Sequence, residues 1–319
     1  MQIALDAMGG DNAPGEIIKG AVEGAKEHKV DIVLVGLEKV VRKELPSLPS
    51  SGVTISVVNA PQTIGMAEAP VEAWRHKKDS SLGVGIQLMR DKKVDAFISA
   101  GNTGAISTFS LFILGRMEGV ERPAIAAVFT SLTGSMTVLL DIGANSDCQP
   151  EHIVQFARLG SRFASGVLGV KSPKVALLNN GSEESKGNRL VRESYQLLRQ
   201  SELNFAGNIE GNELIAGTAD VIVTDGFTGN VALKLAEGLS KAIFTSLKES
   251  LLASPLAKAS KILWGPPIME VASKWDYSIA PGAPLLGVNG NVIKAHGRSD
   301  ASDIVRVIGL AKRMVKEGW

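Results

Sequence analysis

Residues 2–36, QIALDAMGGDNAPGEIIKGAVEGAKEHKVDIVLVG, contain the pattern that decides the fold. The apolar run Ile3–Asp6 predicts a short strand, Pro14–Glu27 has the periodicity of a helix, and Asp31–Gly36 predicts a second strand. Neither strand alternates polar with apolar residues, which is typical of strands buried on both faces. A strand, a helix and a strand in this order indicate a parallel sheet with a crossover helix.

The same alternation continues along most of the chain. Further strands are predicted at Val53–Val58, Val94–Ser99, Lys174–Asn179 and Asp220–Thr224. Further helices are predicted at Val71–Lys77, Leu82–Arg90, Glu151–Ala164, Asn188–Gln200, Asn230–Ser250 and Ala301–Lys316. We therefore expect a three-layer αβα fold, with a mainly parallel sheet and helices on both faces.

One pair of apolar runs departs from this alternation. Ala124–Phe129 and Met136–Asp141 are separated only by a short polar turn. A parallel crossover needs about a dozen residues or more, so this pair must be antiparallel and the sheet is predicted to be mixed. No repeat or Pro/Ser-rich linker divides the chain. We expect a single domain over residues 1–319, with a protruding helical arm at about 245–275.

Composition excludes several classes of protein. The chain is 45% hydrophobic and 21% charged, as in globular proteins with a sizeable core. A net charge of +1 gives no reason to expect nucleic acid as a partner. The only cysteine, Cys148, cannot form an intrachain disulfide, which favours a reducing compartment. The chain opens without signal-peptide features, and its most apolar stretch, Ala105–Leu114, is too short to span a bilayer, so we expect a cytoplasmic protein.

Five loops that follow predicted strands combine glycine with Asn, Thr, Ser or Asp. They are Asp6–Asp11, Ser99–Gly104, Asp141–Asn145, Asn179–Asn188 and Thr224–Asn230. Ligands of parallel α/β sheets bind at the carboxyl ends of the strands, and glycine turns with helix N-termini hold anions there. One such loop is more often an ordinary turn, but five at one edge favour a phosphate-bearing or other anionic ligand.

The standard nucleotide fingerprints are missing. Gly9–Gly15 does not match G-x-G-x-x-G, and no loop ends in Gly-Lys-Ser/Thr, so a dinucleotide or Walker-type site is disfavoured. Carboxylates at strand ends could bind a divalent metal. They also cap helices and turns, and we expect no metal. These carboxylates are Asp6, Asp11, Asp141 and Asp225.

Two further side chains are candidates for chemistry. Lys186 lies just past a predicted strand among small polar residues, where its amine can reach a ligand; the alternative is a solvated lysine that opens a helix. His296 is a candidate acid–base group, against a packing or hydrogen-bonding role. Cys148 has no base beside it, and no G-x-S-x-G elbow supplies a serine nucleophile.

Taken in order, these blocks resemble the bacterial phosphate acyltransferases that make acyl-phosphate for phospholipid synthesis. The similarity extends over essentially the whole chain, and so many ordered blocks are far more specific than one loop. The blocks are Ile3–Asp11, Ser99–Ala105, Asp141–Asn145, Asn208–Gly211, Val223–Asn230, Pro284–Val288 and His296–Ser299.

The resemblance implies transfer of a fatty acyl group from acyl carrier protein to inorganic phosphate, by direct attack of phosphate on the thioester. It implies a fold similar to that of isocitrate and isopropylmalate dehydrogenases and of phosphotransacetylases, without their nicotinamide or metal, so no cofactor is expected. The enzyme must hold a phosphate dianion near the carbonyl and stabilise the developing oxyanion.

The resemblance marks the loops of Lys186 and Asn230 as catalytic. We assign Lys186 to phosphate or the oxyanion, and Asn230 to the neighbouring hydrogen bond. The residues expected to bind phosphate or substrate are Gly101, Asn102, Thr103, Gly104, Gly143, Asn145, Asp225, Gly229 and His296.

The resemblance also implies partners. Acyl carrier protein is acidic, so a basic docking face is expected, with Arg158, Arg162, Arg189 and Arg192 as candidates. The long helix from Asn230 and the apolar arm after it favour a homodimer; the alternative is an arm folded over its own sheet.

The arm is also suited to a membrane surface, because Pro255 places apolar side chains near a tip with lysines beside them. The residues expected at the lipid are Leu251, Leu252, Leu256 and Lys258. The alternative is a buried hairpin in a dimer interface, which needs the same leucines. A membrane glycerol-3-phosphate acyltransferase, the next user of the product, is a further candidate partner.

Two other classes of function stay open at this point. One is a metal- and NAD-dependent dehydrogenase on the same fold, and the other is a non-catalytic scaffold of lipid synthesis.

Overall fold

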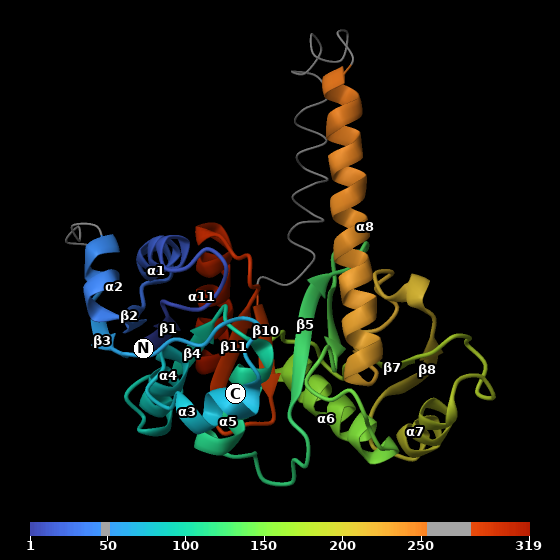
Figure 1. Cartoon of the computed structure of the whole chain (residues 1–319). Helices are drawn as coiled ribbons and strands as arrows, with labels where there is room; N and C mark the ends of the chain where they lie inside the picture. Colours follow the sequence, from blue (N-terminus) through green and yellow to red (C-terminus); the bar gives the residue numbers. More distant parts are fainter. Residues whose placement is uncertain (46–51, 254–281) are drawn as a thin grey trace. The chain divides into compact units, whose positions relative to one another are not determined.

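A computed structural model describes residues 1–45, 52–253 and 282–319 (Figure 1). The chain divides into two compact units. The first comprises Met1–Ala126, Arg158–Lys171 and Pro281–Trp319, and the second comprises Ala127–Ala157 and Ser172–Ala280. The chain passes between the units within strand β5 (Ala124–Thr130) and helix α6 (Pro150–Gly166). The expectation of a single functional domain over residues 1–319 stays a prediction.

The first unit has a mixed sheet in the order β3-β2-β1-β4-β11-β10-β5. Its strands are β1 (Gln2–Asp6), β2 (Asp31–Gly36), β3 (Ile55–Asn59), β4 (Ala96–Ser99), β10 (Gly282–Leu286), β11 (Asn291–Ala295) and the start of β5. Strands β1 to β4 and β11 are parallel, whereas β10 is antiparallel to both β11 and β5. This arrangement confirms the mixed, mainly parallel sheet.

Helices cover both faces of this sheet. They are α1 (Gly15–His28), α2 (Glu38–Glu44), α3 (Pro70–His76), α4 (Ser81–Arg90), α5 (Thr103–Leu114) and α11 (Ala301–Lys316). Helices α1 and α11 lie on one face and α3, α4 and α5 on the other (Figure 1). The three-layer architecture expected from the strand–helix alternation is therefore confirmed.

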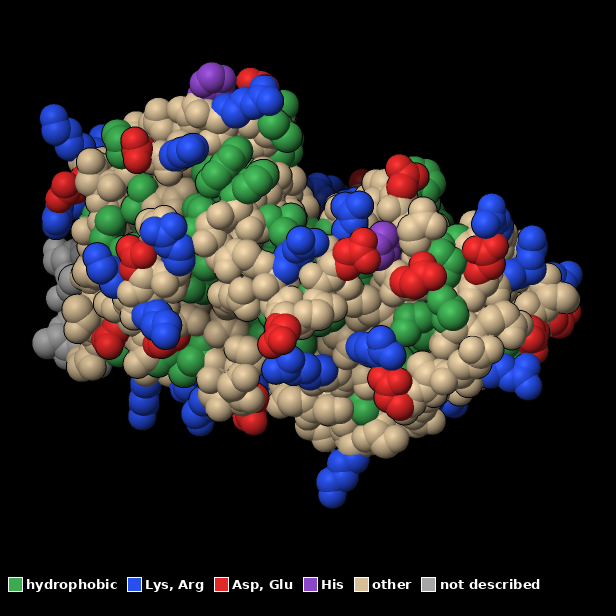
Figure 2. Space-filling view, turned by 90° about the horizontal axis from the view of Figure 1, so that it is seen from below, with side chains coloured by type: hydrophobic (Ala, Val, Ile, Leu, Met, Phe, Trp, Pro, Cys, Tyr) green, Lys and Arg blue, Asp and Glu red, His purple; other side chains and the backbone are tan. Residues whose placement is uncertain are grey.

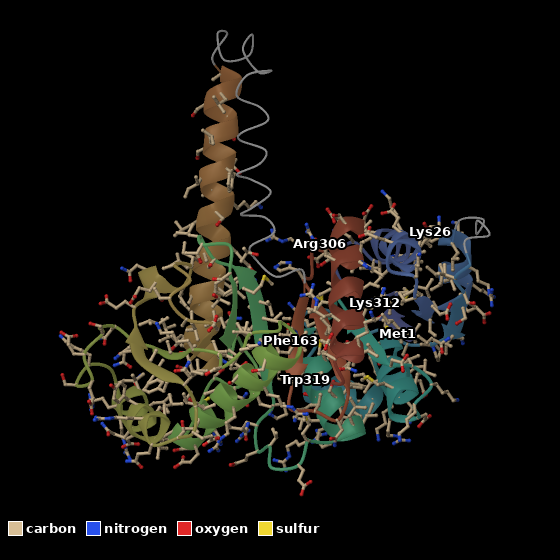
Figure 3. The ribbon with its side chains drawn as sticks, turned by 180° about the vertical axis from the view of Figure 1, so that it is seen from behind. Met1, Lys26, Phe163, Arg306, Lys312 and Trp319 are labelled. Carbon is tan, nitrogen blue, oxygen red and sulfur yellow. The ribbon has the colours of Figure 1, made fainter. Side chains whose placement is uncertain are left out.

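Small residues let α1 and α11 approach closely. A Cβ atom added at Gly20 would lie 2.6 Å from the carbonyl oxygen of Ala301, and one added at Gly24 would lie 2.6 Å from Cδ1 of Ile308. Near the end of the chain, the ring of Trp319 meets Phe163 edge-to-face with centroids 5.4 Å apart (Figure 3). These contacts fix α11, and with it the loop that carries His296, on the first unit.

The second unit has strands in the order β5-β6-β9-β7-β8. They are β6 (Met136–Leu140), β7 (Val175–Leu178), β8 (Phe205–Ile209), β9 (Val221–Val223) and the end of β5. The pairs β6–β9, β9–β7 and β7–β8 are parallel. Residues 131–135 join the neighbours β5 and β6, and a connection this short permits only the predicted antiparallel pairing.

Besides the start of α6, the described part of the second unit has further helical segments. They are α7 (Arg189–Arg199), the short 3-10 turn η1 (Gly211–Glu213) and α8 (Gly226–Ala253). Helix α8 has 28 residues and extends beyond the sheet of its own unit (Figure 1). Of the predicted arm at about 245–275, residues 245–253 form the end of α8, and the remainder lies outside the described residues.

The face of the molecule in Figure 2 has no patch of one charge, and the described helices include no membrane-spanning candidate. Figure 2 shows Lys and Arg interspersed with Asp and Glu on the face in view, as the net charge of +1 leads one to expect. Among the helices within residues 1–45, 52–253 and 282–319, none is both long enough and apolar enough to cross a bilayer.

Candidate active site

In the first unit, the glycine loops lie at one edge of the sheet. Strands β1, β4 and β11 are parallel neighbours, so the loops that follow them leave the same edge. These loops contain Asp6–Asp11, Ser99–Gly104 and His296–Ser299. The structure therefore brings together three of the blocks that the sequence singled out, at the edge where ligands of such sheets bind.

Asp6 is the buried anchor of this edge. It is 3% exposed, and its Oδ2 accepts a hydrogen bond from Oγ of Ser99 at 2.7 Å. Its Oδ1 accepts from the backbone amide of Met8 at 3.1 Å. Burial raises the pKa of Asp6, and hydrogen bonds from Ser81, Ser99 and the amides of Met8 and Gly9 offset only part of that rise. Asp6 thus joins the loop after β1 to the loop after β4 through its buried carboxyl group.

The two loops approach each other too closely for a side chain. A Cβ atom at Gly9 would lie 2.5 Å from Oδ2 of Asp6 and 2.9 Å from the amide nitrogen of Gly101. The amide of Gly101 itself donates to Oγ of Ser99 at 3.0 Å. Gly101, predicted as a phosphate ligand through its amide, therefore uses that amide within its own loop, where it donates to the Ser99 hydroxyl that in turn donates to Asp6.

Asn102 caps helix α5 and clamps a neighbouring loop. Its Oδ1 accepts from the amide of Ala105 at 3.0 Å, while its Nδ2 donates to the carbonyls of Met66 and Glu68 at 2.8 and 2.9 Å. The amides of Thr103 and Gly104 donate to no described residue. The N-terminus of α5 thus presents two backbone donors to an anion.

His296 lies in the loop that joins β11 to α11. The carbonyl of the adjacent Gly297 accepts from the amide of Asp11 at 2.7 Å, and Nδ2 of Asn12 donates to the carbonyl of Arg298 at 3.1 Å. The half-exposed imidazole accepts from the amide of Arg298 through Nδ1 at 3.3 Å. His296 is therefore held beside the loop that follows β1.

The second unit has its own loop edge. Strands β6, β9, β7 and β8 are parallel, so the loops that carry Asn145, Asn230 and Lys186 leave the same edge of this sheet. The amide of Asp141 donates to the carbonyl of Thr224 at 3.0 Å, which joins the ends of β6 and β9 directly.

Asp141 organises the loop after β6. Its carboxylate has no exposed surface and accepts the amides of Gly143 at 3.2 Å, Ala144 at 3.0 Å and Asn145 at 2.6 Å. It also accepts Nδ2 of Asn145 at 3.0 Å. The backbone amide of Gly143, which the sequence suggested for phosphate, thus binds a carboxylate of the protein. Sequence reasoning considered Asp141 as a metal ligand or as a cap of a helix or turn, and the structure shows it capping its own turn.

Helix α8 begins against this loop. Asp225 caps the helix, since its Oδ1 accepts the amide of Thr228 at 2.9 Å and its Oδ2 accepts Oγ1 of Thr228 at 2.7 Å. A Cβ atom at Gly229 would collide with the carbonyl oxygen of Asp141, so Gly229 allows the close approach of helix and loop. The next residue, Asn230, donates from Nδ2 to the carbonyl of Ile142 at 3.0 Å.

Lys186 lies in the loop between β7 and α7. Its side chain is exposed, and it forms no ion pair with a described residue. Its backbone amide donates to the carbonyl of Glu183 at 3.1 Å. The ammonium group is therefore free to meet an anion at this edge.

Other candidates fall elsewhere. Leu251 lies half-buried near the end of α8, whereas the side chain of Leu252, together with Leu256 and Lys258, lies outside the described residues. Within the described part of the chain, no group of three or more His, Cys, Asp or Glu side chains is placed to hold a metal ion. The assigned roles of Lys186, Asn230 and the phosphate ligands stay predictions.

Comparison with known proteins gives the family. The family model described as "Fatty acid synthesis protein" matches residues 1–319. Curated proteins named "Phosphate acyltransferase" include one from Dictyoglomus turgidum, 47% identical, covering 99% of this chain and 94% of that protein. Another, from Desulforamulus reducens, is 48% identical and covers 100% and 95%.

Solved structures confirm the fold. A phosphotransacetylase from Streptococcus pyogenes superimposes with a TM-score of 0.67 at 18% identity, covering 98% of this chain and 94% of that one. A 4-hydroxythreonine-4-phosphate dehydrogenase from Klebsiella pneumoniae gives 0.57 at 15% identity, covering 99% and 97%. Since the curated relatives match along nearly their whole lengths, this chain belongs to the phosphate acyltransferase family, an acyltransferase family of lipid biosynthesis.

Proposed function

We propose that this protein transfers a fatty acyl group from the thioester of acyl carrier protein to inorganic phosphate, in the cytoplasm, for phospholipid synthesis. A phosphate oxygen attacks the thioester carbonyl carbon, a tetrahedral oxyanion forms, and the C–S bond then breaks. The products are acyl-phosphate and the thiol of the carrier, whose proton comes from the attacking hydrogen phosphate. A thioester is a good electrophile, so the step needs no covalent enzyme intermediate.

The observation that carries this proposal is the unpaired ammonium of Lys186 at the loop edge of the second unit. A lysine with no acidic partner among the described residues has no neighbouring carboxylate to compete with an incoming anion. Phosphate binding there places the nucleophile, and the same charge stabilises the oxyanion as it develops. Asn230 supplies a hydrogen bond from the neighbouring loop.

The first unit offers a second set of anion donors. The free amides of Thr103 and Gly104 lie at a helix N-terminus that Asn102 holds in place. Such a terminus carries a partial positive charge and favours phosphate groups. We assign Asn102, Thr103, Gly104 and His296 to substrate binding in the complete enzyme.

The test is to incubate the protein with acyl-acyl carrier protein and labelled phosphate, and to trap acyl-phosphate as the hydroxamate. Formation that needs no ATP, NAD or added metal is expected. No product under any condition would refute the proposal. Formation only with NAD and metal would instead favour a dehydrogenase. Lys186→Ala should lower kcat/KM by about a hundredfold or more, as loss of an oxyanion donor does.

Carrier protein is the proposed acyl donor, and basic side chains are the proposed docking points. Arg189 pairs with Glu193 at 2.7 Å, and Arg162 lies over the ring of Trp319. Arg192 donates to the carbonyl of Gly187 at 2.6 Å. These arginines are exposed at their outer faces and can meet an acidic partner by long-range attraction.

A homodimer is proposed from α8. Large apolar side chains recur at every fourth position of this helix and are exposed. They are Phe227, Val231, Leu235, Leu239, Ile243 and Leu247, with exposed fractions between 38% and 65%. A contiguous exposed apolar row of this size is typical of an interaction surface. A second copy of the chain presents the same row and can cover it.

Contact with a membrane surface is proposed for the residues after α8. The product is an amphiphile, and its release at a bilayer avoids exposing the acyl chain to water, at about 0.8 kcal/mol per CH₂. A membrane glycerol-3-phosphate acyltransferase would then receive acyl-phosphate at the same surface.

A further inference from the structure

Asn208 is a polar side chain in a place where the fold itself needs none. It lies in β8 opposite Leu177 of β7, and it is only 9% exposed. Its Oδ1 is buried and accepts no hydrogen bond from a described residue. A buried polar atom without a partner destabilises the fold, so a leucine would serve the core better. The amide therefore calls for another explanation.

The other end of this amide holds the loop of Lys186. Nδ2 of Asn208 donates to the carbonyl of Glu183 at 3.0 Å. The same carbonyl accepts the backbone amide of Lys186 at 3.1 Å. One oxygen thus joins the buried strand to the backbone of Lys186, and this contact fixes the turn 183–186 to the sheet.

A glycine forms the floor under the lysine side chain. A Cβ atom at Gly181 would lie 2.9 Å from Cγ of Lys186 and 3.0 Å from Oε2 of Glu183. The backbone of Gly181 does not have a positive φ, so alanine is permitted there by conformation. The space above this residue is instead occupied by the stem of Lys186. The strand amide thus fixes the backbone of the turn, and the glycine leaves room for the Cβ and Cγ atoms at the base of the lysine side chain.

We propose that Asn208 is a positioning residue for Lys186, acting through the carbonyl of Glu183, with Gly181 as the second fixed point. This inference rests on the proposed role of Lys186 in binding phosphate or the oxyanion. Asn208 touches no substrate. It fixes the turn so that the lysine needs no reorganisation when phosphate arrives, and a misplacement of about 1 Å can cost about a hundredfold in rate.

The test compares Asn208→Leu and Gly181→Ala, each alone and combined with Lys186→Ala, in the complete chain. Acyl-phosphate formation is measured against phosphate concentration to separate kcat from KM. Either single variant should lower kcat/KM by about tenfold to a hundredfold. The change should fall on kcat or on KM according to which of the two Lys186→Ala changes. Neither should lower it further when Lys186 is already alanine, because a residue that acts only through the lysine has nothing left to position.

Asn204 provides the matched control. It lies just before β8, and its Nδ2 also donates to a backbone carbonyl, that of Ser172, at 3.0 Å. Asn204→Ala should leave kcat and KM unchanged. The inference would be overturned if Asn208→Leu had wild-type kinetics. It would also be overturned if Asn208→Leu lowered kcat/KM by the same factor in the wild type and in Lys186→Ala. If Asn208→Leu fails to fold, Gly181→Ala provides the same two tests.

The proposed function is judged separately. An inactive wild-type chain refutes the reaction, and a fully active Lys186→Ala variant refutes the lysine's role.

Discussion

Asn230 and Ile142 are joined by one hydrogen bond, from the side-chain Nδ2 of the first to the backbone carbonyl of the second, at 3.0 Å. Ile142 directly follows the buried Asp141, so the bond ties the start of α8 to the loop after β6. The amide of Asn230 is thereby oriented before any ligand binds, as electrostatic stabilisation of a transition state requires.

Asn230→Ala should lower kcat/KM by about a hundredfold or more, with a loss of stability of only about 1 kcal/mol, since one hydrogen bond disappears. Acyl-phosphate kinetics and urea unfolding measure the two effects. Asn289, exposed in the first unit, also donates to backbone carbonyls, at 2.9 Å to Arg116. Asn289→Ala should reproduce the stability loss without the kinetic one. Equal kinetics for the two variants would contradict a catalytic Asn230.

Asp141→Asn should destabilise the protein by about 2–4 kcal/mol. The carboxylate accepts several backbone amides, and the substitution replaces one of its oxygens with an NH2 group, which cannot accept them. Gly143, Ala144 and Asn145 lose one of the two oxygens that accept their amides, and the NH2 group in its place faces an N–H donor. The midpoint of urea unfolding checks this expectation. A variant as stable as the wild type would show that the loop keeps its shape without the charge.

Asp6 should make stability depend on pH in the direction opposite to a salt-bridged carboxylate. Burial raises its pKa above the ordinary 3.8, so the folded state binds the proton more tightly than the unfolded state. The stabilisation by this proton is present below 3.8 and is lost as the pH rises through the raised pKa. Relative to Asp6→Asn, the wild type should thus lose stability from pH 4 to pH 7, measured by urea unfolding. If the wild type instead gained stability relative to Asp6→Asn from pH 4 to pH 7, the pKa of Asp6 would be lowered rather than raised in the folded state.

Leu239→Glu should shift the protein from dimer to monomer in sedimentation at micromolar concentration. Leu239 is 54% exposed in the middle of the apolar row of α8, and a buried unpaired carboxylate opposes association. Thr245→Glu adds the same charge to an exposed position of α8 outside the row, and should leave the dimer intact. A monomeric wild type, or equal effects of both variants, would contradict the proposed interface.

Leu256→Glu tests membrane contact, at a position outside the described residues. The dimer and activity in solution should persist, while flotation with anionic liposomes is lost, because a carboxylate is repelled by the headgroups and avoids the acyl layer. Dissociation or unfolding would place Leu256 in an interface instead. Unchanged flotation would end the proposal.

Sequence patterns predicted the strand–helix alternation well because buried parallel strands have long apolar runs. Helix α5 was missed because Ala105–Leu114 has apolar residues on nearly all sides of the helix and so shows no helical periodicity. Strands β10 and β11 were also missed, since Pro281–Gly297 is rich in glycine and proline and resembles a loop. Tertiary pairing with β4 and β5 makes them strands.

The candidate site was predicted as loops rather than as contacts. Spacing indicates which loops share an edge, but not that the amide of Gly101 binds Ser99 or that Asp141 occupies the amides of its own loop. Asn208 belonged to a block matched only by resemblance, and no pattern distinguishes a buried asparagine from a turn residue. Its role depends on a carbonyl 25 positions away in sequence, which local periodicity does not encode.

The apolar side chains of α8, from Phe227 to Leu247, do not form a straight stripe. A step of four residues turns about 400° round an α-helix, so each side chain is displaced by about 40° from the one before. Phe227 and Leu247 therefore face nearly opposite directions. Two such helices cannot lie parallel along their lengths; ridges of this spacing interlock at a crossing angle of about −50°. In the proposed dimer the two α8 helices would then cross in the shape of an X, in contact at Leu235 and Leu239, and their ends would lie apart.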